Sequence, residues 1–170
     1  MALSVRMMIV PEIDFLDDYF QSSPPEHLEM LGVDPTRLPS RSAWHERLER
    51  EFDLPVEKRS VLHVAWLLND EPIGFSMSDK IVFGERANMH LHVVNPENRN
   101  RGIGTECVRR SVDIYFEALK LKRLFCEPNA FNVAPNRTLQ KAGFRYVKTH
   151  MTVPSALTYH QAVTRWVIER

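Results

Sequence analysis

The sequence predicts a mixed α/β fold: a single mixed, mostly antiparallel sheet with one parallel strand–helix–strand crossover and helices on both faces. The first observation is the order of elements over 88–127, where a strand, a glycine-containing turn, a long helix and a second strand follow one another. Two strands joined in this way run parallel in one sheet. The second observation is that short connections join the flanking strands, which makes those pairs antiparallel.

The first half of the chain supplies three helices and a hairpin. Its pattern predicts a strand at 4–10, helices at 11–21, 26–31 and 43–52, a loop at 32–40, and strands at 60–68 and 72–83. Pro11 fits the start of the first helix, because proline is favoured at the first helical position. Ser42 is the expected N-cap of the third helix. Trp44, Leu48 and Phe52 lie four residues apart in that helix, which predicts one buried stripe.

The second half alternates strands and helices. Its pattern predicts strands at 88–94, 123–127, 144–153 and 163–169, and helices at 105–121 and 135–142. Val108, Val112, Tyr115 and Leu119 recur at three-to-four spacing and form the apolar face of the long helix. Gly143 fits the end of the last helix. We find no repeat or interdomain linker, so residues 1–170 are predicted to form a single domain.

The composition is that of an ordinary globular protein, with 44% hydrophobic and 26% charged residues. Lys and Arg number 22, as do Asp and Glu, so the formal net charge is zero. A neutral chain gives no general argument for a nucleic-acid or membrane partner. No apolar run approaches the roughly 20 residues of a membrane span, and the N-terminal residues lack the features of a signal peptide. These observations predict a cytoplasmic protein.

The two cysteines, Cys107 and Cys126, fall in a predicted helix and a predicted strand. Neither has a second ligand at the short spacing typical of a metal site, so we expect no metal. We expect two reduced thiols in the core, as in most cytosolic proteins. A disulfide and a catalytic thiol stay open as alternatives.

The turn before the long helix is the strongest functional signal. It reads Arg99-Asn100-Arg101-Gly102-Ile103-Gly104. A glycine-rich helix N-terminus offers unpaired backbone N–H groups to an anion such as phosphate. A P-loop would need Gly-Lys-Ser/Thr, but Thr105 and Glu106 follow the second glycine. A dinucleotide fingerprint would need a third glycine where Cys107 stands. The remaining pattern, with its two arginines, suits a pyrophosphate.

This turn, between a strand and a long helix, resembles the acyl-CoA signature of the GNAT superfamily of N-acetyltransferases. A second segment agrees with it, because residues 132–144 read Asn-Val-Ala-Pro-Asn-Arg-Thr-Leu-Gln-Lys-Ala-Gly-Phe. That segment resembles the CoA-proximal helix of the superfamily, most closely in the RimJ/RimL-like branch, although Pro135 stands where the branch usually has serine. The resemblance covers about residues 88–147. It implies a GNAT-like fold. In the superfamily the first third of the chain usually shapes the acceptor site, and in this sequence that third carries no motif of the superfamily.

The resemblance implies roles for specific residues. Backbone N–H groups of Arg99, Asn100, Arg101, Gly102, Ile103, Gly104 and Thr105 would bind the CoA pyrophosphate. Val93 and Val94 would pair with the pantetheine arm as an added half-strand. Asn132 and Asn136 would lie near the pantetheine or the adenine, although Asn132 fits a helix cap equally well. In the family this strand also diverges from its neighbour at a bulge, and the thioester lies in the gap.

Acetyl transfer to an amine benefits from a base, since an alkylammonium has a pKa of about 10.4. Histidine suits this task, and His90 and His92 lie on the strand beside the expected thioester. Period-two alternation puts both on one face with Asn88, unless a bulge after His90 rotates His92 away. Asn88 stands where other members have Glu or His, and it cannot act as a base. We therefore favour His90 as the proton acceptor, directly or through water, with His92 as the second candidate.

The usual acid of the superfamily is a tyrosine four residues before the Gly-Phe pair, and this chain has Leu139 there. The proton for the departing thiol must then come from another group or from water. Tyr159 and His160 are spare candidates in the loop between the last two strands, where they also fit a solvated loop.

The sequence therefore predicts an N-acetyltransferase that moves an acetyl group from acetyl-CoA to a primary amine by direct attack in a ternary complex. The acceptor would be a protein N-terminus or a small-molecule amine, and the enzyme a monomer or a homodimer. A non-catalytic acyl-CoA-binding sensor or partner domain is the alternative, because the tyrosine is missing and asparagine stands at position 88.

Overall fold

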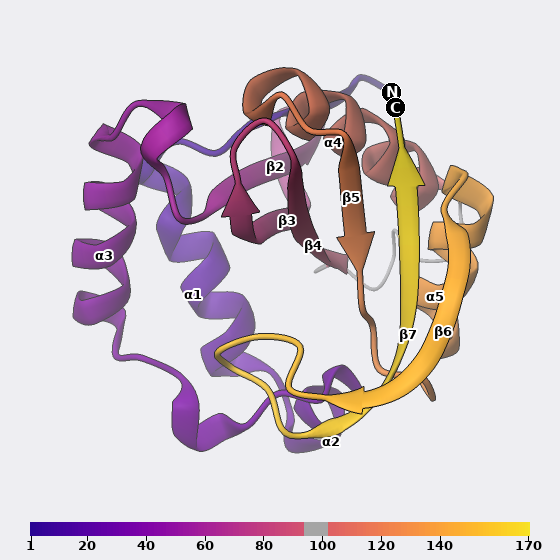
Figure 1. Ribbon diagram of the computed structural model, residues 1–170. Helices are drawn as coiled ribbons and strands as arrows, with labels where there is room; N and C mark the ends of the chain where they lie inside the picture. The colour runs from indigo at the N-terminus through magenta and orange to yellow at the C-terminus, as the bar shows by residue number, and fades with distance from the viewer. Residues whose placement is uncertain (94–101) are drawn as a thin grey trace.

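The computed structural model describes residues 1–93 and 102–170, within which seven strands form one sheet (Figure 1). The strands are β1 (Leu3–Met7), β2 (Leu62–Leu68), β3 (Glu71–Val82), β4 (Arg86–Val93), β5 (Arg123–Cys126), β6 (Arg145–Thr152) and β7 (Gln161–Glu169). Their order across the sheet is β1-β2-β3-β4-β5-β7-β6. β4 and β5 run parallel, and the other neighbouring pairs are antiparallel. The predicted fold class is confirmed.

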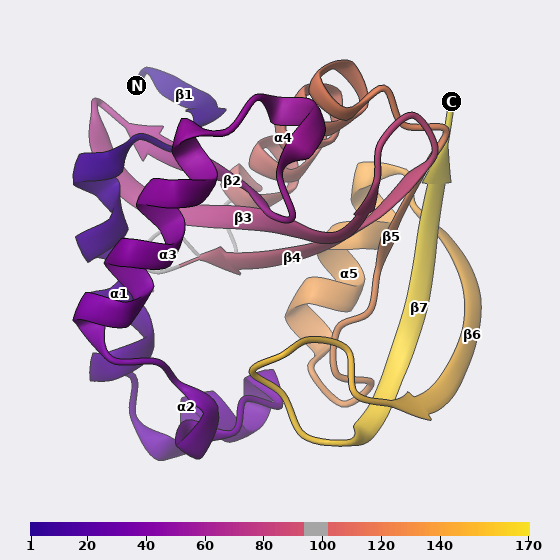
Figure 2. The same cartoon turned by 60° about the vertical axis from the view of Figure 1, so that its left-hand side comes forward.

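Helices cover both faces of the sheet (Figures 1 and 2). They are α1 (Ile13–Ser22), α2 (Pro25–Leu31), α3 (Arg41–Asp53), α4 (Ile103–Leu119) and α5 (Val133–Ala142), with short 3-10 turns η1 (Val10–Glu12), η2 (Pro35–Arg37) and η3 (Val56–Lys58). Neighbouring residues of a strand point to opposite faces. Trp66 of β2 therefore joins the core under α4, while Ala65 and Leu67 join the core under α1 and α3.

The predicted apolar face of the long helix is confirmed, because Val108, Val112, Tyr115 and Leu119 are at most 1% exposed. The stripe on α3 is also present: Trp44 and Leu48 are buried and Phe52 is partly buried. Periodicity locates such faces because a helix packed on a sheet must bury one side.

A buried polar cluster joins the sheet to α4. The indole N–H of Trp66 donates to Ser111 Oγ at 2.8 Å, and Ser76 Oγ lies 2.8 Å from the hydroxyl of Tyr115. A polar group left unpaired at this depth would cost about 1–3 kcal/mol. The cluster therefore fixes β2 and β3 on α4, and with them the position of β4.

The prediction that Ser42 caps α3 is wrong. The helix begins two residues earlier, and Ser40 is the N-cap, with its hydroxyl accepting the backbone N–H of Ala43 at 3.2 Å. Ser40 has extended backbone angles, as an N-cap residue requires, whereas Ser42 lies inside the first turn.

Ser40→Ala is expected to lower the free energy of unfolding by about 1 kcal/mol, because it removes the only side-chain acceptor observed at this helix start among the described residues. Ser42→Ala is the matched control and should change that free energy by less than about 0.5 kcal/mol. Urea denaturation of both variants checks the difference, and equal effects would contradict the assignment of the cap.

β4 diverges from β5 halfway along its length. The parallel ladder ends at the pair Met89–Cys126, and β4 continues to Val93 beyond it. The pairing of β4 with β3 steps one for one from Asp79–Asn88 to Gly74–Val93. His90 and His92 therefore stay on one face of the sheet, and the alternative in which a bulge separates them is not what the structure shows.

The connection between β6 and β7 reaches across to the segment after α2 (Figure 2). We call the contact between residues 32–37 and 157–161 the loop clamp. Its hydrogen bonds run from Asp34 N to Leu157 O (2.8 Å), from Tyr159 N to Gly32 O (3.0 Å), from Arg37 Nη1 to Thr158 O (3.1 Å) and from Gln161 Nε2 to Gly32 O (3.0 Å). The clamp closes the space between the N-terminal helices and the C-terminal strands on one side.

None of the helices in residues 1–93 and 102–170 combines the length and the hydropathy that a bilayer crossing needs. Cys107 and Cys126 are buried free thiols, in line with the expectation of reduced core cysteines. Burial raises the pKa of Cys107 to about 12 and also raises the pKa of Cys126, which keeps both thiols protonated and unreactive at neutral pH.

Candidate active site

Two cavities meet at the end of β4. The inner cavity, of about 170 Å³, lies between α1, α3, the sheet and the loop clamp. The outer cavity, of about 440 Å³, lies between the N-terminus of α4, α5 and the α1–α2 region. Their linings share Leu31, Leu91, His92, Asn132 and Pro135, so the two spaces adjoin.

The outer cavity is built to receive an anion. Gly102, Gly104 and Thr105 line it at the N-terminus of α4, a 17-residue helix whose first N–H groups lack intrahelical partners. Gly102 has φ +75°, and a Cβ placed there would have no atom within 4 Å. The backbone is therefore open to a ligand at this point, and a side chain would be strained.

Two cations on α5 complete the outer cavity. Arg137 and Lys141 both line it, and neither side chain forms an ion pair within the described part of the chain. No motif in the sequence marked them. Their spacing of four residues on a helix, which puts both on one face, is the signal that could have found them. A helix N-terminus beside two cations suits a pyrophosphate or a phosphate monoester.

The other residues predicted to bind the cofactor differ in their surroundings. Val93 lines the outer cavity, whereas Ile103 packs partly against the core. Val94, Arg99, Asn100 and Arg101 lie outside the described residues.

Asn132 is the N-cap of α5 and lines both cavities, while its side chain makes no capping bond. Asn136 lines neither cavity. Its amide nitrogen donates to Asn129 O (3.1 Å) and Asn132 O (2.8 Å), and its oxygen accepts the indole N–H of Trp166 at 2.9 Å. The side chain of Asn136 therefore holds the loop before α5 onto β7.

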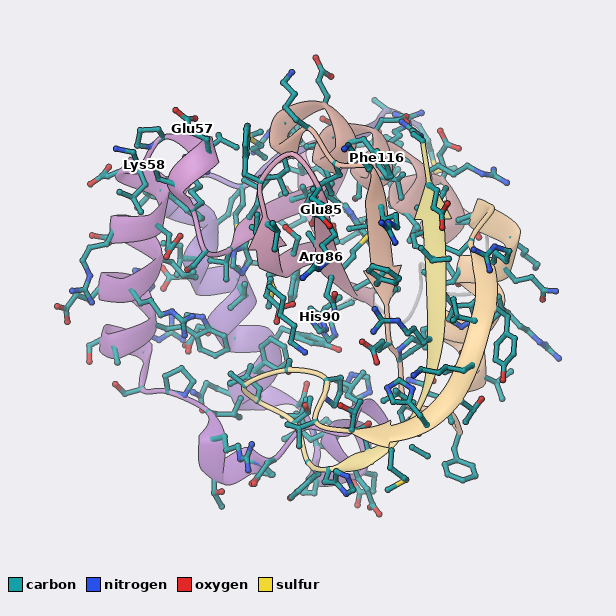
Figure 3. The ribbon with its side chains drawn as sticks, viewed as in Figure 1. Glu57, Lys58, Glu85, Arg86, His90 and Phe116 are labelled. Atoms are coloured by element: carbon teal, nitrogen blue, oxygen red, sulfur yellow. The ribbon has the colours of Figure 1, made fainter. Side chains whose placement is uncertain are left out.

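His90 of β4, which is labelled in Figure 3, lines the inner cavity, and a carboxylate lies beside it. Its Nε2 is 3.0 Å from Asp79 Oδ1, and both side chains are less than one fifth exposed. Asp79 of β3 pairs with Asn88 of β4, so it lies diagonally across from His90. Because a carboxylate only accepts hydrogen bonds, Nε2 carries the proton in this contact, which leaves the lone pair on Nδ1. Sequence reasoning missed Asp79, although the hairpin register could have located it.

His92 is a neutral imidazole held among aromatic rings. Its ring centroid lies 5.0 Å from that of Phe75 and 5.2 Å from those of Phe20 and Tyr19. Burial lowers the pKa of His92 to about 3, with smaller contributions from His90 and His27. Protonating His92 would place a charge in an apolar setting, which disfavours it as a base.

A hydrogen-bonded chain leads from His92 toward α2. The hydroxyl of Tyr19 lies 3.3 Å from His92 Nδ1 and 2.7 Å from His27 Nε2. Tyr19, His27 and His92 all line the outer cavity. Tyr19 falls within the predicted helix over 11–21, and no linear motif marks its contact with His92, 73 residues away.

The other residues considered for the proton at sulfur do not line either cavity. Leu139, at the position of the superfamily's usual tyrosine, is fully buried in the core. Tyr159 and His160 line neither cavity. Asn88 has a structural partner, because its amide donates to Glu127 Oε1 at 3.2 Å. The same Glu127 oxygen accepts from Arg165 at 2.8 Å, so the carboxylate links β4 to β7.

Comparison with known proteins gives relatives both in sequence and in structure. The aminoglycoside N(6')-acetyltransferase type 1 of Klebsiella pneumoniae is 27% identical over 125 residues, which cover 66% of this chain and 61% of that protein. The chain thus spans about 61% of the length of this relative.

Two solved structures share the fold. RimL, a ribosomal α-N-protein acetyltransferase in complex with coenzyme A, aligns with a TM-score of 0.78 and 14% identity, over 99% of this chain and 94% of that one. The spermidine N-acetyltransferase of Vibrio cholerae, in complex with CoA and spermine, gives a TM-score of 0.78 and 15% identity, over 98% and 95%. At these identities the likeness is one of fold.

A family model described as the acetyltransferase (GNAT) domain matches residues 8–145. The match includes β2 to β5 and the helices α1 to α5, and it therefore extends over the N-terminal helices for which the sequence offered no motif. This chain belongs to the acetyltransferase (GNAT) domain family.

Proposed function

We propose that this protein transfers the acetyl group of acetyl-CoA to a primary amine. The observation that carries the proposal is the junction of the two cavities at β4, with an anion-binding helix terminus on one side and the His90–Asp79 pair on the other. The relatives named above act on aminoglycosides, spermidine and a ribosomal protein by name, and each of those acceptors carries an amine.

The outer cavity has the groups that coenzyme A needs. The N-terminus of α4 would bind the pyrophosphate, Arg137 and Lys141 would pair with phosphate oxygens, and Val93 would lie beside the pantetheine arm. When bound, acetyl-CoA supplies an activated acyl group in the form of a thioester.

The inner cavity would hold the amine beside His90. The new bond joins the amine nitrogen to the acetyl carbon as the carbon–sulfur bond breaks, the amine gives up one proton and the sulfur gains one. His90 Nδ1 accepts the amine proton, and Asp79 orients the ring and stabilises the resulting imidazolium. Asp79 acts as a positioning residue, because its carboxylate acts through His90.

Tyr19 is the group we assign to supply the proton at sulfur. Its hydroxyl faces the outer cavity and is bonded to His27, a partly buried imidazole that can replace the proton from solvent. Tyr19→Phe is expected to lower kcat about ten-fold. Calorimetry should show an unchanged affinity for coenzyme A. An unchanged kcat across the pH range would contradict the assignment.

Gly74 keeps β3 close to the end of β4. A Cβ at this position would lie 2.6 Å from the carbonyl oxygen of His92 and 2.8 Å from Trp66. Gly74→Ala is therefore expected to displace the end of β4, to lower the free energy of unfolding by about 1–3 kcal/mol, and to weaken coenzyme A binding.

Gly84→Ala is the matched control for Gly74→Ala. Gly84 has φ +79° and open space around it, and it lies outside both cavities, so alanine there costs stability without touching the ligand. Urea denaturation and calorimetric titration with coenzyme A separate the two effects. Equal coenzyme A affinity in the two variants would show that Gly74 does not position β4 for the cofactor.

The proposed function is tested with the purified protein, acetyl-CoA and a panel of primary amines. We expect coenzyme A, but not ATP, to raise the melting temperature, and at least one amine to drive release of free thiol. Coenzyme A binding with no thiol release from any amine would instead support an acyl-CoA-binding sensor, and the absence of both would reject the proposal.

A further inference from the structure

The inner cavity is mainly apolar where it would hold the acceptor. Its lining includes Leu16, Phe20, Trp44, Leu48, Phe75 and Met77, drawn from α1, α3 and β3. These side chains surround the face of β4 that carries His90. When the amine of an acceptor reaches His90, the rest of the acceptor molecule, here called its body, lies among aromatic and aliphatic side chains. This lining favours an acceptor with an apolar body.

The charges of the cavity do not suit a polycation. Among the described residues, Asp79 and Glu127 are the carboxylates in the lining. Asp79 is paired with His90, and Glu127 is paired with Arg165 at 2.8 Å and lies 3.2 Å from Nε2 of His150. Arg47 adds a positive charge to the same lining. A second or third ammonium group would find both carboxylates already engaged by His90 or by Arg165 and His150, and these pairs would not fully compensate its desolvation.

The loop clamp argues against a polypeptide acceptor. Hydrogen bonds from Asp34, Arg37, Tyr159 and Gln161 tie the two clamp segments together, and the amide of Gln161 fills the space that a Cβ on Gly32 would occupy. A chain continuing beyond its N-terminal residue would have to break these bonds to pass on that side. A small molecule fits behind them.

We infer that the acceptor is a small monoamine with an aromatic or branched apolar body, and that it is neither a polycation nor a protein N-terminus. This inference rests on the proposed function and names its substrate class. The amine lies at the His90–Asp79 pair, and the body packs against Phe20, Trp44 and Phe75.

The test compares five acceptors with the intact protein: phenethylamine, isopentylamine, spermidine, kanamycin and a hexapeptide with an N-terminal alanine. Thiol release gives kcat/KM for each, and calorimetry in the presence of coenzyme A gives binding independently of turnover. We expect phenethylamine or isopentylamine to exceed the other three by about ten-fold or more in kcat/KM.

The outcomes separate the two proposals. A higher kcat/KM for spermidine, kanamycin or the peptide overturns the inference and leaves the acetyltransferase function standing. Binding of the apolar amines without acetylation supports the inference and rejects the function. Failure of both apolar amines to bind overturns the inference.

A charge change in the lining gives a second readout. Arg47→Glu places a carboxylate at an exposed position on the cavity wall, and should shift the ratio of kcat/KM values toward spermidine by about ten-fold. Arg50→Glu is the matched control, since it makes the same change on the same helix outside the lining. An equal shift in both variants would mean that the lining charge does not select the acceptor.

Discussion

Replacing His90 with alanine is expected to lower kcat/KM about 100-fold or more, because it removes an imidazole that lines the inner cavity and lies 3.0 Å from the carboxylate of Asp79. Coenzyme A affinity should be unchanged, since His90 does not line the outer cavity. Asp79→Asn should lower kcat by a smaller factor, because the ring would keep its place and lose the stabilisation of its charged form.

The measurement is a pH profile of kcat/KM for the wild type and the variants, with His160→Ala as a control for loss of an exposed histidine outside both cavities. The profile of His90→Ala should differ from that of the wild type, whereas His160→Ala should keep the wild-type profile. A His90→Ala enzyme with full activity and an unaltered profile would rule out His90 as the base.

The second large effect is on stability in acid. His63 and His92 are both held neutral, because burial lowers the pKa of each from 6.5 to about 3. Arg47, His90 and Arg59 lower the pKa of His63 further, while Asp79 raises it. Between pH 6.5 and about 3 the unfolded chain therefore binds protons that the folded chain does not.

The sign of the effect follows from that difference. The stabilisation is complete above pH 6.5, and it is lost as the pH falls toward the folded pKa values. Each histidine can contribute a slope of up to about 1.4 kcal/mol per pH unit to the free energy of unfolding.

Urea denaturation at several pH values between about 7 and 5 measures this slope. His63→Gln and His92→Gln should each make it shallower, and His160→Gln should leave it unchanged because His160 is exposed. A slope that is the same in all four proteins would show that neither buried histidine governs acid lability.

Much of the fold could be predicted from local patterns. The helix over 103–119 follows from four apolar residues at regular spacing, and the parallel pair of β4 and β5 follows from the order of the elements. The start of α3 could not be predicted in the same way, because Ser40 and Ser42 are both good capping residues and tertiary packing decides between them.

The candidate site could be predicted in part where its residues lie on one strand or one turn. His90, His92, Gly102 and Gly104 line the two cavities, and their roles there stay predictions. Asp79 and Tyr19 were missed because each reaches the site through a contact between segments distant in sequence. Asn136 has the family's sequence context, yet its amide is taken up by bonds to the loop before α5 and to Trp166.

The two cavities share part of their lining and differ in the rest, and this has a consequence for how the protein can diversify. α3 and the loop clamp line the inner cavity but not the outer one. Substitutions in α3 can therefore change the shape of the inner cavity while the N-terminus of α4 and the cations of α5 keep their places. Variation of the inner wall is in this way separable from the anion-binding end.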